Sequence, residues 1–120
     1  MPLELDIQLK PEDTIMVVST KGELDDYNAP KLNDTLTDII DHQGFLKIIV
    51  NLEETTYVDS VGLGTIAIAA KKVARKNGSL NIVCTKPQVV KLLDASGMVS
   101  MIKRNIGLYE TLDQARSNMK

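Results

Sequence analysis

The sequence is poor in the residues that build disulfides, metal sites and base-stacking surfaces. It contains one cysteine, one histidine, no tryptophan and 3% aromatic residues. The single cysteine, Cys84, excludes an intrachain disulfide, and it lies in a different predicted element from His42, with no closely spaced metal ligand beside either. Few aromatic side chains also argue against stacking with single-stranded nucleic acid. We therefore expect no metal site and no cofactor.

Excess positive charge and long apolar runs are missing too. The net charge of −2 argues against binding to duplex nucleic acid, which requires a basic face. No apolar stretch approaches the length that spans a membrane, and Pro2, Glu4 and Asp6 interrupt the N-terminus too early for a signal peptide. These absences predict a soluble, cytoplasmic protein that binds neither nucleic acid nor membranes.

What is present is the pattern of one α/β domain. The 120 residues, 43% of them hydrophobic, suffice for one core, so we assign residues 1–120 to a single domain. Alternating or continuous apolar residues predict strands, and apolar residues three and four apart predict helices. The predicted strands are 3–9, 14–20, 46–52 and 80–84, with a turn at 11–13 and a candidate last strand at 99–102; the predicted helices run from Asn28 to Gly44, from Ser60 to about Asn77, from Thr85 to Ser96 and from Thr111 to about Asn118. This order predicts an α/β layer fold with a mixed sheet.

Residues 58–65 carry the candidate functional site, where a predicted loop at 53–59 leads into the second helix. Ser60 is a good N-cap residue, because its side-chain oxygen can accept from the backbone N–H of Gly62 or Leu63, and replacing it with alanine would then cost about 1 kcal/mol. Gly62 and Gly64 remove side chains beside the hydroxyl, so another macromolecule can approach it closely. A serine at the positive end of a helix suits a phosphate group.

Four acidic residues, Glu23, Asp25, Asp26 and Asp59, lie in predicted loops that follow strands. In an open α/β sheet such loops gather on one edge. Two interpretations stay open: these acids are simply solvated, or some of them flank Ser60 and help the metal of a kinase or phosphatase to reach it. The two interpretations differ most for Asp25 and Asp59.

Two apolar residues near the start of the second helix do not belong to its core-facing stripe. Ile68 points nearly opposite Ile66, and Val61 lies one row of side chains above Ile68. A second covering layer could bury both side chains. Alternatively, they form an exposed apolar strip beside Ser60, which would mark a surface for a partner.

Enzymatic and nucleotide-binding interpretations fit the same stretch less well. Serine hydrolysis with Ser60 as nucleophile and His42 as base lacks the Gly-x-Ser-x-Gly motif, because Val58 occupies the first glycine position. Residues 62–67 spell a dinucleotide fingerprint, but residues 53–59 separate them from the apolar strand. No acid follows at the distance where such a site binds a ribose.

Several short segments resemble one known family. Residues 59–64, Asp-Ser-Val-Gly-Leu-Gly, look like the signature of STAS domains, specifically the bacterial anti-sigma factor antagonists, also called anti-anti-sigma factors. Residues 22–25 followed by 29–32 look like their second conserved block, and residues 112–115 fit their last helix. The resemblance covers nearly the whole chain. It implies a four- to five-stranded mixed sheet with about four helices mainly on one side.

In that family the serine that matches Ser60 is phosphorylated by an anti-sigma factor that is itself an ATP-binding serine kinase. The resemblance implies that the unphosphorylated protein sequesters this kinase and frees a sigma factor, and that a metal-dependent, PP2C-like serine phosphatase resets the switch. It implies a binding protein without catalytic activity. Val61, where relatives often carry Ser, Thr or Ala, departs from the family pattern, as does the acidic pair at 53–54; both could alter the choice of partner.

We therefore predict phosphorylation of Ser60 and binding of the partner by the residues around it. The predicted partner-binding residues are Glu23, Leu24, Asp25, Asp59, Ser60, Val61, Gly62, Leu63 and Ile68. Two alternatives stay open: a structural STAS module that never meets a kinase, and a nucleotide-binding protein.

Overall fold

The computed structural model describes residues 4–95 and 106–119. Its described residues form five strands, four α-helices and one π-helical turn. The strands are β1 (Asp6–Glu12), β2 (Ile15–Leu24), β3 (Lys47–Val58), β4 (Ser79–Val83) and β5 (Ile106–Tyr109). The helices are α1 (Ala29–Thr37), α2 (Ser60–Arg75), α3 (Pro87–Ala95) and α5 (Leu112–Ser117), and the π-helical turn η1 (Asp38–His42) continues α1.

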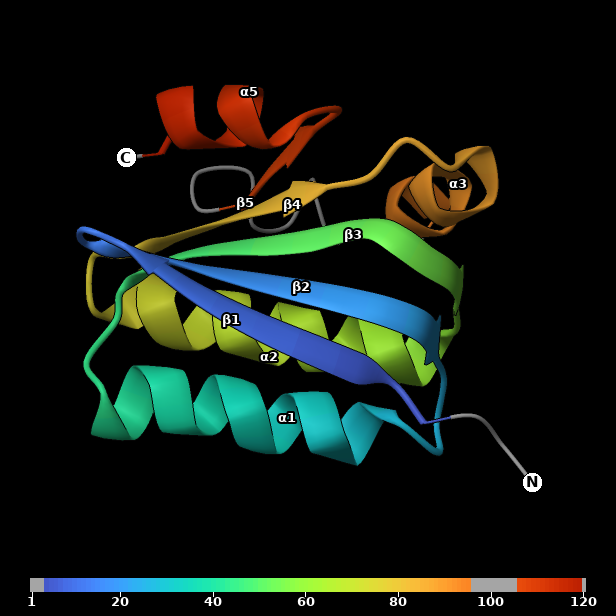
Figure 1. The fold of residues 1–120 in the computed structure, drawn as a ribbon, viewed down its shortest axis with the longest axis horizontal. Helices are drawn as coiled ribbons and strands as arrows, with labels where there is room; N and C mark the ends of the chain where they lie inside the picture. The colour runs from blue at the N-terminus through green and yellow to red at the C-terminus, as the bar shows by residue number, and fades with distance from the viewer. Residues whose placement is uncertain (1–3, 96–105, 120) are drawn as a thin grey trace.

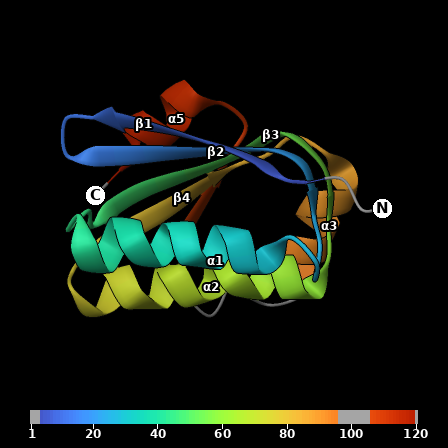
Figure 2. The same cartoon turned by 60° about the horizontal axis from the view of Figure 1, so that its bottom comes forward.

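The strands form one sheet in the order β1-β2-β3-β4-β5. β1 and β2 pair antiparallel as a hairpin, whereas β2, β3, β4 and β5 pair parallel with their neighbours. Helices α1 and α2 lie side by side against one face of the sheet, and α5 lies on the other face (Figures 1 and 2). The predicted α/β fold with a mixed sheet is confirmed. Among the described residues, no helix combines the length and the apolar character needed to cross a membrane.

The main core fills the space between the sheet and the pair α1 and α2. Helix α1 and η1 contribute the stripe of apolar residues at helical spacing that the sequence predicts, and each of these residues is buried. These residues are Ala29, Leu32, Leu36, Ile39 and Ile40. A smaller core on the opposite face joins α5 to the sheet through Val17, Ile49, Val83 and Ala115. Helices therefore cover both faces of the sheet, with the larger pair on one of them.

A bidentate ion pair fastens α5 to the β1–β2 hairpin. Arg116 donates from Nε to Oε1 of Glu12 at 2.6 Å and from Nη2 to Oε2 at 3.0 Å. The hydrogen bonds from Arg116 hold the pKa of Glu12 below its ordinary value. The residues are 104 positions apart in sequence, so this contact ties the two ends of the chain together.

Strands β2 and β3 are longer than the sequence predicts. The predicted end of the second strand at residue 20 and the predicted loop at 53–59 are both wrong, because the two segments pair with each other. Lys21 lies opposite Glu54 and Leu24 lies opposite Val58, with register irregularities that fall on either side of Gly22. Gly22 has a φ of 111°, a conformation that glycine adopts without strain. Glu23 and Leu24 consequently lie on a strand and not in a loop.

The ends of the chain differ from the prediction in detail. β1 continues through Glu12, and the turn consists of Asp13 and Thr14, so the predicted turn at 11–13 is displaced. β5 lies shortly before the last helix, and the sequence does not predict it. The candidate strand at 99–102 and the predicted helix end at Ser96 lie outside the described residues. The last helix is confirmed, and Thr111 caps it by accepting from the N–H of Gln114 at 3.1 Å.

Candidate functional site

Ser60 is the first residue of α2, and Asp59 is its N-cap. The backbone of Asp59 is extended, and its Oδ1 accepts a hydrogen bond from the N–H of Gly62 at 2.8 Å. The carbonyl oxygen of Asp59 accepts from the N–H of Leu63 at 2.9 Å. The predicted capping role of Ser60 is therefore wrong by one residue. The strand pairing causes this shift, because β3 continues to Val58 and leaves Asp59 at the junction.

The same carboxylate connects α2 to the segment between β2 and α1. Oδ2 of Asp59 accepts from the N–H of Asp26 at 2.9 Å, and the N–H of Asp59 donates to the carbonyl oxygen of Leu24 at 3.2 Å. Both carboxylate oxygens of Asp59 are thus used by backbone donors from two different segments. Asp59 holds the β2–α1 connection against the start of the Ser60 helix.

Asp25 has a comparable role at the start of α1. Its Oδ1 accepts from the N–H of Asn28 at 2.9 Å, and its carbonyl oxygen accepts from the N–H of Ala29 at 2.8 Å. The side chain of Asn28, buried at 4% exposure, donates to the carbonyl oxygen of Glu23 at 2.8 Å. Asp25 and Asp59 therefore organise the backbone around Ser60. No set of acidic, histidine or cysteine side chains among the described residues is arranged to hold a metal ion.

The two glycines that follow Ser60 have different roles. A Cβ atom on Gly62 would overlap the carbonyl oxygen and the side chain of Leu24, so Gly62 permits close packing between α2 and β2. A Cβ atom on Gly64 would meet nothing within 4 Å. The expectation that both glycines expose the hydroxyl is therefore wrong for Gly62, which faces inward.

The predicted partner-binding residues divide into a surface set and an interior set. Leu24 and Leu63 are 0% and 4% exposed, and Gly62 is buried, so these residues belong to the interior. Ser60, Val61, Ile68 and Glu23 are exposed, and Asp25 and Asp59 are half-buried. The interior set packs beneath the exposed set, and partner binding by either set stays a prediction.

Val61 and Ile68 are 52% and 53% exposed on α2, which decides between the two interpretations of these residues within the described chain. No described layer buries them, and they form an apolar strip on the helix that Ser60 begins. We call Ser60, Val61 and Ile68 the Ser60 surface. Exposed aliphatic side chains next to an exposed hydroxyl suit a docking protein, because they lose contact with water when a partner covers them.

Two exposed aromatic residues near this site are not predicted from the sequence. Tyr27 is 59% exposed and lies directly after Asp26, in the segment that Asp59 holds. Tyr57 is 49% exposed and lies two residues before Asp59. Tyrosine is enriched in protein interfaces because its ring is apolar and its hydroxyl is polar. The scarcity of aromatic residues in this chain is the signal that could have drawn attention to them.

The remaining candidate residues have structural roles or none near Ser60. Nδ1 of His42 lies 3.0 Å from Oδ1 of Asp38 on the exposed end of η1, and Cys84 is buried. Hydrogen bonds from Gln43 and His42 lower the pKa of Asp38. His42 belongs to the far end of α1 and η1, so the structure gives no support to a pair formed with Ser60.

Comparison with known proteins agrees with this geometry. A model of the STAS domain family matches residues 6–115. The chain is 28% identical over 100 residues to the anti-sigma-B factor antagonist of Bacillus subtilis strain 168, covering 83% of this chain and 90% of that protein. It is 30% identical over 105 residues to the protein of the same name from Staphylococcus aureus strain NCTC 8325, covering 88% of this chain and 96% of the relative.

Solved structures share the fold. An anti-sigma factor antagonist from Mycobacterium paratuberculosis superposes with a TM-score of 0.85 at 23% identity, covering 96% of this chain and 93% of that one. The Bacillus cell fate determinant SpoIIAA in its phosphorylated form superposes with a TM-score of 0.72 at 20% identity, covering 93% and 97%. These likenesses show the shared fold, and the match of the family model over residues 6–115 shows that the chain belongs to the STAS domain family.

Proposed function

We propose that this protein is an anti-sigma factor antagonist, which binds an anti-sigma factor and thereby frees a sigma factor. Relatives at 28% and 30% identity over most of the chain carry this name. In the proposed cycle the anti-sigma factor is an ATP-binding serine kinase that phosphorylates Ser60 and so ends its own sequestration. A PP2C-like serine phosphatase removes the phosphate. The role requires binding and no catalysis by this chain.

The observation that carries the proposal is that Asp59, and not Ser60, caps the helix. Asp59 caps α2, and no side-chain hydrogen bond within residues 4–95 and 106–119 involves the exposed hydroxyl of Ser60. A kinase can therefore modify this hydroxyl without removing a bond that stabilises the fold. The phosphate would lie at the positive end of a sixteen-residue helix, which tolerates negative charge.

The physical chemistry favours a switch of binding over a switch of fold. A phosphate adds about −1.5 to −2 charges. The helix N-terminus offsets this charge by roughly 0.3–1 kcal/mol within the protein. In a docked complex the phosphate also brings bulk and must lose water, and an unpaired buried charge costs several kcal/mol. The carboxylate of Asp59, one residue away, adds repulsion. The cost at the interface therefore exceeds the gain within the protein.

Titration calorimetry with the cognate anti-sigma factor kinase tests the proposal. We expect Ser60→Asp to keep the wild-type circular dichroism spectrum and to bind at least about tenfold more weakly, which corresponds to about 1.4 kcal/mol. Ser60→Ala should bind as the wild type does and resist inactivation by ATP. Ser117→Asp, an exposed serine on α5, is the matched control and should leave binding unchanged.

Two results would contradict the proposal. One is wild-type affinity in Ser60→Asp, and the other is equal weakening in Ser117→Asp, which would indicate a general effect of charge. A structural STAS module without a switch predicts the first of these results. Because the aspartate carries less charge than a phosphate, the phosphorylated protein should bind more weakly still.

A further inference from the structure

The antiparallel strand β1 forms one edge of the sheet, and it carries a pattern that is complementary to itself. Its first five residues read Asp-Ile-Gln-Leu-Lys, at positions 6–10. Reversed about Gln8, the sequence places an acid opposite a base and one aliphatic residue opposite another. We propose that β1 pairs antiparallel with β1 of a second copy of this chain, about a twofold axis at Gln8, so that two sheets join edge to edge.

The backbone groups available on this edge fit that register. The hairpin turn consists of Asp13 and Thr14, with Glu12 opposite Ile15. Because hydrogen-bonded and non-hydrogen-bonded pairs alternate along an antiparallel ladder, this turn directs the N–H and C=O groups of Ile7 and Leu9, and the C=O group of Pro11, to the free edge. Pro11 has no N–H, as is usual for proline on the open side of an edge strand.

The backbone groups of Leu5, the residue before β1, are already occupied. The N–H of Leu5 donates to Oδ1 of Asn28 at 3.3 Å, and its carbonyl oxygen accepts from Nζ of Lys31 at 2.7 Å. Ile7 and Leu9 are therefore the β1 residues that present both an N–H and a C=O on the open edge. In the register centred on Gln8, Ile7 of one copy lies opposite Leu9 of the other. The N–H and C=O groups of these two residues then pair with each other, and the twofold axis repeats the pair on its other side.

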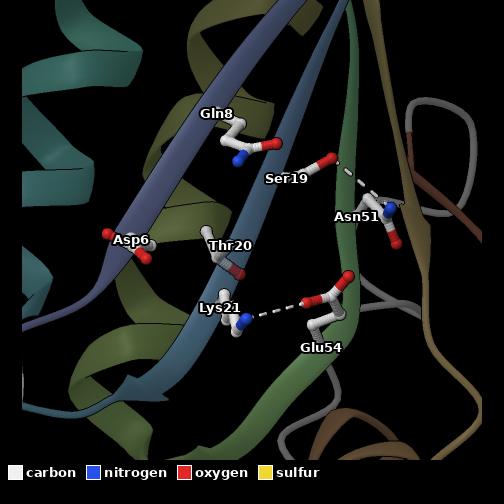
Figure 3. A pocket seen from close by; sticks show the side chains of 7 residues that line it. All are labelled: Asp6, Gln8, Ser19, Thr20, Lys21, Asn51 and Glu54. Carbon is white, nitrogen blue, oxygen red and sulfur yellow. Dashed lines mark hydrogen bonds and ion pairs between the residues drawn. The ribbon is translucent and has the colours of Figure 1, made fainter.

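The side chains fit the same register. Leu9 is 43% exposed, one of the few large apolar side chains left uncovered among the described residues, and Ile7 of the second copy would cover it. Asp6 and Gln8 project on the face of the sheet that carries Ser19 and Lys21, where they line a polar hollow (Figure 3). Lys10 has the same parity and so lies on this face too. Asp6 of one copy would meet Lys10 of the other in a non-hydrogen-bonded pair, where side chains approach most closely.

Neither charge is strongly engaged within one copy. Lys21, which lies opposite Asp6 on β2, forms its ion pair with Glu54 at 3.8 Å. Lys10 lies 3.5 Å from Glu12, but the carboxylate of Glu12 is held more closely by Arg116. The neighbouring register centred on Leu9 places Lys10 opposite Gln8 and Asp6 opposite Glu12, a pair of like charges. The register centred on Ile7 places Asp6 opposite Gln8 and Lys10 opposite Glu4, which precedes the strand. Of these three registers, only the one centred on Gln8 pairs opposite charges between residues of β1, and it does so twice.

Exchange of charges tests the proposal with the intact protein. We expect the wild type to shift from monomer to dimer across a concentration series in sedimentation velocity. Asp6→Lys alone and Lys10→Asp alone should each remain monomeric, because each variant opposes like charges in both pairs. An equimolar mixture of the two variants should form a heterodimer, since each acid then meets a base. Lys71→Glu, an exposed change on α2, is the control and should dimerise as the wild type does.

A disulfide at the twofold axis gives a second, independent test. Opposite residues in a non-hydrogen-bonded antiparallel pair have Cα atoms about 4.5 Å apart, within the range that a disulfide spans. Gln8→Cys should therefore form a covalent dimer on mild oxidation, and the buried Cys84 provides no competing thiol. Lys71→Cys should cross-link at least about tenfold more slowly. A monomeric wild type at every concentration, a mixture that stays monomeric, or equal cross-linking of both cysteine variants would each overturn the proposal.

Discussion

The assignment of the N-cap to Asp59 makes a sharp prediction about two adjacent residues. If Asp59 caps α2, then Asp59→Ala should destabilise the protein substantially, and Ser60→Ala should not. If Ser60 were the cap, as its sequence context suggests, the order would be reversed. The pair of variants therefore tests the geometry of the candidate site without any partner protein.

The magnitude follows from the bonds that Asp59 makes. Loss of the cap to Gly62, at 2.8 Å, costs about 0.5–2 kcal/mol. Loss of the exposed bond from the N–H of Asp26, at 2.9 Å, adds roughly 0.5–1.5 kcal/mol. We expect Asp59→Ala to lower the free energy of unfolding by roughly 1–3.5 kcal/mol in total. Ser60→Ala should change it by less than about 0.5 kcal/mol, as is usual for an exposed residue.

Urea denaturation followed by far-ultraviolet circular dichroism is the appropriate assay. The midpoint should fall in Asp59→Ala while the dependence on urea stays unchanged, because the surface exposed on unfolding is the same. Asp59→Asn keeps one carbonyl oxygen and should lose only part of the stability. If Ser60→Ala is as unstable as Asp59→Ala, Ser60 supplies the cap and the assignment to Asp59 is wrong.

Three further predictions concern the glycines after Ser60, the ion pair of Glu12 and the Ser60 surface. Gly62→Ala should destabilise by about 1–3 kcal/mol because its Cβ overlaps Leu24, whereas Gly64→Ala should be neutral or stabilise by up to about 1 kcal/mol, and thermal unfolding of both variants checks the contrast. Glu12 has a pKa below its ordinary 4.5 because Arg116 donates hydrogen bonds to it, so the stability that it contributes is complete above pH 4.5 and is lost as the pH falls through the lowered pKa. Glu12→Gln should be less stable than the wild type at neutral pH by roughly 1 kcal/mol, after discounting for solvent screening. This variant should also lose less stability on acidification than the wild type. Val61→Asp and Ile68→Asp should each weaken kinase binding in calorimetry by at least about tenfold while Leu9→Asp leaves it unchanged, and wild-type affinity in both α2 variants would remove the Ser60 surface from the interface.

The sequence predicts the central layers of this fold well. The apolar stripe from Ala29 to Ile40 and the continuous aliphatic run in β3 are predicted directly from periodicity. The spacing of apolar residues indicates whether one face or both faces of an element are buried. The crossover from β3 through α2 to β4 follows for the same reason. Local propensity and tertiary packing agree in these elements.

The features that the sequence does not predict depend on partners distant in the chain. The extension of β3 through Glu53–Val58 exists because the end of β2 pairs with it, and a strand with several exposed residues does not show its pairing in its own pattern. The inward role of Gly62 depends on the position of Leu24. The cap at Asp59 follows from where β3 ends. Serine and aspartate are both good caps, so propensity alone cannot choose between adjacent candidates.

Mapping of phosphate by mass spectrometry tests whether the hydroxyl of Ser60 is the group that the kinase modifies. The wild-type protein and Ser60→Ala are incubated with the anti-sigma factor kinase and ATP, then digested and analysed. We expect a single phosphate on the peptide that contains Ser60, and no phosphate on the Ser60→Ala protein. Phosphate on a different residue, or equal labelling of both proteins, would show that the exposed hydroxyl at the start of α2 is not the switch.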